Sequence, residues 1–262
     1  MLLRSQTVVL LVLAAGLSRP AAPTRVTDPT RCAAEADSIL GFGPSAVAGP
    51  AWDDPGAQET LRRLSDAFAA KPRGDQAKCV LASVEQTALQ AVAAHPEIVE
   101  DRYALAVVLG LRADHEGGTS KVRAASRMYD QLRRILALTP DHVGAHHLLG
   151  RLQAGVMRMN RVTRWIATNI LGGGVLRGAS WDEAERNLAF AIRGAPSIPD
   201  YHYELARLYE DTGRVQLALQ EAQLVLAMDP SKAIEAVVPA KAAALVARMQ
   251  RATTSSGKHA PP

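Results

Sequence analysis

Histidines in the stretch GAHHLLGR, residues 144–151, are the side chains of this chain best placed by type and spacing to do chemistry. His142 and His146 are four residues apart, which puts both imidazoles on one face of a helix and is a spacing used by zinc sites. A zinc site needs a further protein ligand, and neither a third ligand at a readable spacing nor an HExxH motif is present. A metal-dependent hydrolase around His142, His146 and His147 is therefore the least favoured of the three functions considered below. We expect no metal or other cofactor.

Other catalytic signatures are missing from the sequence as well. The patterns GxSxG, GxxxxGK[ST] and GxGxxG do not occur, and LGGGVLRG, residues 171–178, is better interpreted as the end of a helix. We therefore predict that the protein is not an enzyme.

The composition favours an all-α fold. The chain has 262 residues, of which 48% are apolar and only 4% aromatic, so its core must be built from small and aliphatic side chains, as closely packed helices allow. After an irregular lead-in rich in Gly and Pro, apolar residues recur with the period of a helix. This periodicity predicts helices over residues 58–70, 76–94, 96–114, 120–138, 142–159, 162–171, 181–194, 200–212, 215–228 and 231–250.

The amino terminus has the layout of a secretory signal. One early arginine precedes an apolar run from Thr7 to Leu17, and small residues and prolines follow. The run is shorter than the ~20 residues that a membrane-spanning helix needs. We interpret residues 1–22 as a signal peptide, 23–57 as the lead-in, 58–250 as the helical domain and 251–262 as a disordered tail. The alternative is an uncleaved leader or a short anchor. Export predicts a periplasmic or envelope-associated protein.

The chain contains two cysteines, Cys32 and Cys79. In an oxidising compartment they could form one disulfide, and otherwise they would be two small buried side chains. The spacing of a single pair does not decide between these alternatives.

The segment from Pro199 to Pro230 resembles a tetratricopeptide repeat, a hairpin of two helices whose small and large residues interlock. Its packing positions are held by Leu205, Ala206, Tyr209, Gly213, Ala218 and Asp229. Second helices of such hairpins end before Pro96, Pro140, Pro196 and Pro230, at intervals of 44, 56 and 34 residues. Insertions of about ten and twenty residues therefore interrupt the 34-residue period. We predict an irregular solenoid of antiparallel helical hairpins, with His146 at a packing position of one first helix.

The longer insertion, residues 155–180, carries an unusual concentration of positive charge. No Asp or Glu lies between His142 and Trp181, whereas five arginines do. Its predicted helix places Met159, Val162, Ile166 and Ile170 on one stripe. In one interpretation the stripe packs on the core, with the arginines solvated or paired with acidic helices. In the other, arginine and tryptophan side chains form a docking edge for an acidic partner or an anionic membrane surface.

A narrower resemblance covers residues 141–230. The order HHLLGR, RWIATNILGG, SWDEAERNLAFAI and YHYELARLYEDTGRVQLALQEA is similar to the regulator of microtubule dynamics family and its bacterial relatives. That resemblance implies an all-helical, non-enzymatic protein and supplies no catalytic residue. Animal members associate with microtubules and mitochondria. The apparent export signal departs from that setting, so we carry over the fold and not the microtubule role.

These observations favour an exported scaffold that binds a protein or peptide partner along its first helices. The second hypothesis is a peripheral membrane or cytoskeletal binder that uses the basic insertion. Nucleic acid is an unfavoured partner, because one arginine cluster without interleaved aromatic residues is a poor footprint for it. The pattern does not indicate an oligomeric state. The candidate contact residues are His146, Arg151, Arg158, Arg161, Arg164, Trp165, His202 and Tyr203.

Overall fold

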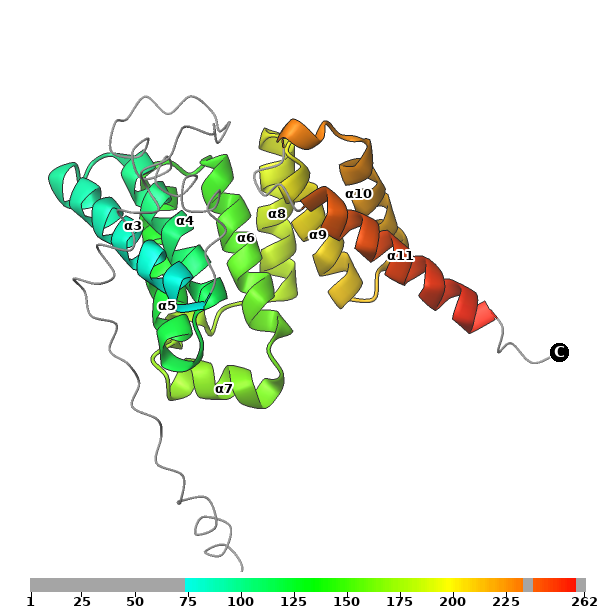
Figure 1. Ribbon diagram of the computed structural model, residues 1–262, viewed down its shortest axis with the longest axis horizontal. Coiled ribbons are helices and arrows are strands. Elements are labelled where there is room, and N and C mark those ends of the chain that lie inside the picture. Colours follow the sequence, from blue (N-terminus) through cyan, green and yellow to red (C-terminus); the bar gives the residue numbers. More distant parts are fainter. Residues whose placement is uncertain (1–73, 233–237, 258–262) are drawn as a thin grey trace, which may run out of the picture.

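The computed structural model describes residues 74–232 and 238–257, and these residues form helices without strands (Figure 1). The α-helices are α3 (Gly74–Ala94), α4 (Val99–His115), α5 (Gly118–Leu138), α6 (Val143–Arg158), α7 (Arg161–Asn169), α8 (Trp181–Gly194), α9 (Pro199–Asp211), α10 (Val215–Ala227) and α11 (Val238–Gly257). Two short 3-10 turns, η1 (Gly174–Leu176) and η2 (Pro230–Lys232), complete the described elements. The all-α prediction is confirmed. The signal segment, Cys32 and the helix expected at residues 58–70 lie outside the described residues.

The observed helices agree closely with the expected ones, except at the carboxyl-terminal end. Helix α8 has the predicted bounds, whereas the helix predicted from Ser231 begins at Val238 and continues to Gly257 instead of Gln250. Pro239 is the second residue of the described helix, and proline is tolerated in the first turn of a helix but not in its interior.

Consecutive helices pack as antiparallel neighbours along an extended array. Helix α4 packs on α5, α6 on α8, and α9 on α10, while α3 and α11 cover the two ends of this series. Figure 1 shows the array running from α3 to α11, with the short α7 set below it. The arrangement is solenoid-like, as predicted.

The second helices bury equivalent residues in each hairpin. These positions lie twelve, eight and five residues before a proline, and all are at most 3% exposed. They are Met128, Leu132 and Ile135 on α5, Ala184, Leu188 and Ala191 on α8, and Ala218, Ala222 and Val225 on α10. The repeat is therefore preserved in the packing even where insertions have changed its length.

First helices need a small residue where they approach their partners. Ala106, Gly150 and Ala206, each ten residues after a proline, hold this position. At Gly150 a Cβ atom would lie 2.8 Å from Cγ of Leu188 and 2.9 Å from the carbonyl oxygen of Ala184. Helices α6 and α8 are thus in backbone-to-side-chain contact at this point.

We expect Gly150→Ala to lower the free energy of unfolding by about 1–3 kcal/mol, because the added methyl group overpacks the α6–α8 contact. Gly155→Ala, in the same helix, is the matched control, since a Cβ there meets no atom within 4 Å. The control should be neutral or stabilising by about 0.5–1 kcal/mol through helix propensity. Urea unfolding of both variants checks this, and equal stabilities would contradict the packing argument.

Candidate functional site

His146 on α6 ties the start of its hairpin to the second helix. Its Nε2 donates to the Pro140 carbonyl oxygen at 2.8 Å, and its Nδ1 lies 2.7 Å from Oδ1 of Asn187 on α8. The ring also stacks on Phe190, with centroids 4.0 Å apart. His146 therefore holds α6 against α8, as expected for a packing position.

His202 makes the same pair of contacts in the next hairpin. Its Nε2 donates to the Pro196 carbonyl oxygen at 3.0 Å, and its Nδ1 lies 2.7 Å from Oε2 of Glu221 on α10. Burial alone would lower the pKa of His202, but the hydrogen bonds to Glu221 and to the Pro196 carbonyl outweigh it and raise the pKa above its usual value. The Glu221 carboxylate therefore favours the charged form of this imidazole.

Arg102 takes the equivalent position on α4. Its Nη2 donates to the Pro96 carbonyl oxygen at 2.6 Å and its Nη1 to Oε1 of Gln131 on α5 at 3.3 Å. We call this arrangement the polar clamp: a side chain six residues after a proline bonds that proline's carbonyl and a polar residue on the second helix. Sequence reasoning missed Arg102, although its distance from Pro96 is the signal that would have found it.

The three histidines of the stretch from His142 to His147 all make contacts within the protein. Both ring nitrogens of His146 lie against protein oxygens, and Nδ1 of His142 accepts from the Ala145 N–H at the start of α6. His147 is buried with its ring 4.4 Å from that of Tyr201. Within residues 74–232 and 238–257 no three His, Cys, Asp or Glu side chains are grouped as metal ligands. These contacts assign the histidines to packing.

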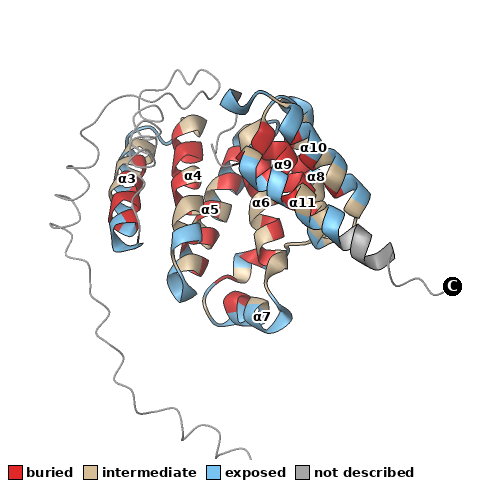
Figure 2. Ribbon diagram, turned by 45° about the vertical axis from the view of Figure 1, so that its right-hand side comes forward, coloured by how far each residue is buried: buried red, intermediate tan, exposed pale blue. Residues whose placement is uncertain are grey.

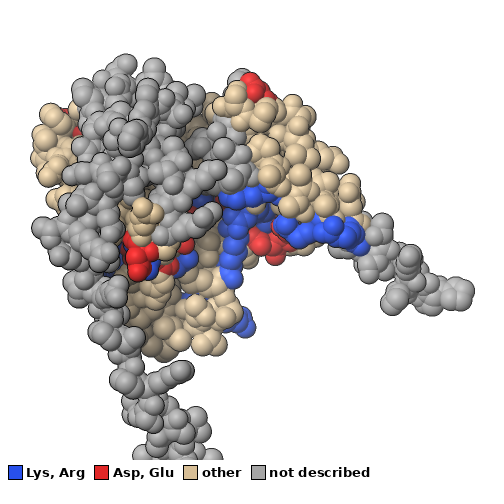
Figure 3. Space-filling model, viewed as in Figure 1, with Lys and Arg blue, Asp and Glu red and all other residues tan. Residues whose placement is uncertain are grey.

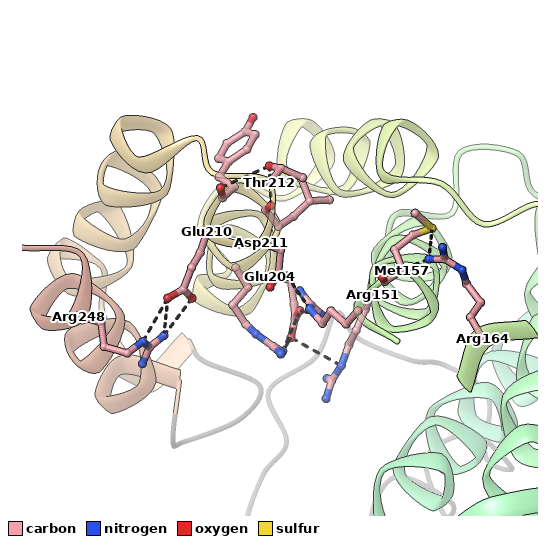
Figure 4. Close-up of polar contacts among 12 residues, drawn as sticks. Arg151, Met157, Arg164, Glu204, Glu210, Asp211, Thr212 and Arg248 are labelled. Carbon is pink, nitrogen blue, oxygen red and sulfur yellow. Dashed lines mark hydrogen bonds and ion pairs between the residues drawn. The ribbon is translucent and has the colours of Figure 1, made fainter. Parts of the chain in front are cut away.

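Charged side chains of the first helices meet on another face. Glu204 on α9 is buried, with a side chain 6% exposed, and its carboxylate faces Arg151 at 3.7 Å, Arg158 at 3.9 Å and Arg207 at 3.2 Å. Arg158 also donates to Asp211 at 2.6 Å. One buried carboxylate is therefore shared by three guanidinium groups from α6 and α9 (Figure 4).

A separate ion pair joins α9 to α11. Arg248 makes a bidentate pair with Glu210, with nitrogen–oxygen distances of 3.0 Å. Figure 3 shows Lys and Arg side chains gathered on the underside of the array between α6 and α11, where the surface is hollowed. We call Arg151, Arg158, Arg207 and Arg248 with this hollow the arginine face. The sequence analysis found the first two; Glu204 and Arg207 could have been found because they lie three residues apart on one helix face.

The remaining candidate residues fall into two groups. His202 and Tyr203 are buried, and Tyr203 belongs to the core between α9, α10 and α11, so the structure places both side chains in the packing of the hairpin. Arg161, Arg164 and Trp165 lie on α7 and, among the residues that the structure describes, make no hydrogen bond or ion pair with Glu204. Arg164 donates instead to the Met157 carbonyl oxygen of α6 at 3.3 Å. The structure thus brings together Arg151 and Arg158 but not the whole predicted set.

The interpretation that the apolar stripe of the insertion packs on the core is wrong. Val162 and Ile170 are 69% and 62% exposed, and the residues that α7 buries are Ala167 and Thr168. The helix lies with its small side inward, and the chain that follows it donates to both residues, from the Gly173 N–H to the Ala167 carbonyl and from Arg177 to the Thr168 carbonyl.

Cys79 is buried in α3 and disulfide-bonded. None of the described helices is long and apolar enough to span a bilayer.

A comparison with known protein families shows which family this chain belongs to. The sequence pattern of the family described as regulator of microtubule dynamics protein 1-3 matches residues 53–250. The chain belongs to this family. The match includes all of α3 to α10 and most of α11, so the clamps and the arginine face of this member of the family lie inside it. No curated protein matches the chain.

We expect Glu204→Ala to lower the free energy of unfolding by about 2 kcal/mol, because three partly buried arginines would lose their shared carboxylate. Glu183→Ala is the control, since Glu183 pairs with Arg186 on the surface of α8 and should contribute less than about 1 kcal/mol. Chemical denaturation of the two variants measures the difference. If both changes cost the same, Glu204 does not organise the arginine face.

The His202 clamp should make stability depend on pH. A raised pKa means that the stabilisation is fully present below the unfolded-state pKa of about 6.5 and is lost as the pH rises through the folded-state value. Between pH 6 and pH 8 the wild-type protein should therefore lose more free energy of unfolding than His202→Gln. His142, whose pKa burial lowers, contributes in the opposite direction, and comparing the two proteins cancels it. Parallel pH profiles would contradict the charged clamp.

Proposed function

We propose that this protein is a non-enzymatic scaffold that binds an acidic segment of a partner protein along the arginine face. Membership of the regulator of microtubule dynamics family supports a protein-binding role related to microtubule regulation and supplies no catalytic chemistry. The finer assignment, to an acidic partner and to this face, rests on the arrangement of the arginines.

The observation that carries the proposal is the preorganised set of guanidinium groups. Arg207 and Arg248 keep 35% and 49% of their side chains exposed, while Glu204 and Glu210 fix them from the protein side. A guanidinium has five N–H donors in a rigid fork, so one already paired with an internal carboxylate can still bind a second. Arginines fixed in this way lose little side-chain entropy when an acidic segment binds.

We also propose export to the bacterial envelope or periplasm, on the basis of the pattern in residues 1–22. In that compartment the partner is an envelope protein, and the relation of the family to microtubules does not transfer. In a cell with microtubules, the acidic partner is a component of the microtubule system. Both settings call for the same recognition chemistry.

A direct test compares Arg151→Gln/Arg248→Gln with wild type for binding to a fluorescent ten-residue glutamate peptide and to purified microtubules. This pair leaves buried Glu204 with Arg158 and Arg207, so the fold is expected to persist. The matched control is Arg133→Gln/Arg134→Gln, which removes the same charge from the exposed surface of α5. We expect the first variant to bind at least tenfold more weakly in fluorescence anisotropy, or to sediment less with microtubules, and the control to change by less than about twofold.

Equal losses in the two variants would mean that overall charge, and not the arginine face, governs binding. An absence of binding by the wild-type protein to the glutamate peptide would overturn the acidic-partner proposal, whereas binding to the peptide without binding to microtubules would favour the envelope setting.

A further inference from the structure

Helix α7 presents a continuous apolar stripe to solvent. Val162, Trp165 and Ile170 are 69%, 58% and 62% exposed, and Ile166 is 36% exposed between them. Val175 of the following turn adds a fifth exposed apolar side chain, at 44%. Single exposed apolar residues are ordinary on a protein surface. Five on one short segment indicate a surface that contacts a membrane or another protein.

The local fold holds the stripe outward. The Gly173 N–H donates to the Ala167 carbonyl oxygen at 3.0 Å, and a Cβ at Gly173 would lie 2.9 Å from Cγ1 of Val122 on α5. Gly172, with φ of +83°, makes the turn that allows this approach. Figure 2 shows exposed residues along the outer side of α7, which projects from one edge of the array. The stripe is a ridge and not a groove.

Two exposed arginines lie at the ends of the segment that carries the stripe. Arg161 is exposed at the first position of α7, and Arg177 follows η1. In the described part of the chain, the guanidinium groups of Arg161, Arg164 and Arg177 do not lie within ion-pair distance of a carboxylate. Arg151 and Arg158, which belong to the same acid-free stretch of sequence, do pair with carboxylates. The edge around the stripe therefore attracts anions.

We propose that α7 is a membrane-contact helix, which inserts its apolar stripe into the interface of an anionic phospholipid bilayer while its arginines contact lipid phosphates. A tryptophan beside isoleucine and valine on one face, with an exposed arginine at the start of the helix, has the chemistry of helices that lie in the bilayer interface. A projecting ridge suits a deformable planar surface, whereas a docked peptide needs a groove.

A second copy of the chain fits this surface less well. Two α7 helices packed face to face would bring their arginines together without any acid between residues 142 and 181 to offset them. Nine helical residues also form a much smaller patch than the roughly 20 residues a side of a stable protein interface. The charge and the small size both favour lipid.

The test measures binding of the full chain to phosphatidylcholine vesicles with and without about 30% phosphatidylglycerol, by flotation at low and high salt. Trp165→Ser/Ile170→Ser removes the centre of the stripe without touching a buried residue. Leu224→Ser/Leu226→Ser is the matched control, because it removes two side chains of α10 that are 47% and 46% exposed. We expect the α7 variant to bind phosphatidylglycerol vesicles at least tenfold more weakly, and the α10 control to bind like wild type.

The electrostatic part has its own pair of variants. Arg161→Gln should weaken binding roughly fivefold, as expected for one charge near an anionic surface, and Arg133→Gln should not. Binding should also fall when salt is added. A vesicle-induced blue shift of tryptophan emission should be lost in Trp165→Phe, which places the inserted residue on α7 and not at Trp52 or Trp181.

Three outcomes would overturn the proposal. Unchanged binding of Trp165→Ser/Ile170→Ser would mean that another part of the chain contacts lipid. Equal binding to neutral and anionic vesicles would exclude the anionic surface. Dimerisation in analytical ultracentrifugation that the α7 variant abolishes, without vesicle binding, would assign the stripe to a second copy. The Arg151→Gln/Arg248→Gln variant should keep its vesicle binding, so this proposal can fail independently of the proposed function.

Discussion

The hydrogen bond from a first-helix side chain to the carbonyl of the preceding proline is the interaction on which the array depends. Each proline ends a second helix, and its carbonyl oxygen is left at the junction between hairpins without a helical partner. Arg102, His146 and His202 each donate to that oxygen and, with a second nitrogen, contact the following helix. One side chain thereby fixes the junction and the angle of the hairpin together.

The arginine face follows from this arrangement. Helices α6 and α9 of neighbouring hairpins lie in contact, and Glu204 thereby comes within reach of Arg151 and Arg158. A carboxylate buried among three guanidinium groups costs desolvation energy, and it is tolerated because each partner remains partly hydrated. The same arrangement keeps the arginines in place for a ligand.

The longer insertion is attached to this framework without disturbing it. The repeat positions of α6 and α8 on either side of it remain buried, so the added chain leaves and rejoins the hairpin at its loop end. Its helix is held by Ala167, Thr168 and the backbone of Gly173, which together cover little of its surface. The insertion can therefore acquire a binding role of its own while the hairpin retains its packing.

Much of the fold was readable in the sequence because helix periodicity, prolines and small residues are local signals. The bounds of α8, the repeat positions around Leu205 and Ala206, and the packing role of His146 follow from spacing alone. Pro239 was also a local signal against one uninterrupted helix from Ser231 to Gln250. The charge of the insertion was visible as well.

Only the tertiary structure decided which side of a helix faces the protein. The stripe of Val162 and Ile170 has the period of a core face, yet the backbone approach at Gly173 turns it to solvent. Likewise, Arg151 and Arg158 pair with carboxylates of α9, some fifty residues away in sequence. Arg161 makes no such pair within residues 74–232 and 238–257, and only the tertiary contacts distinguish these arginines. Periodicity fixes that a helix has two unlike faces, and packing between distant segments fixes where each face points.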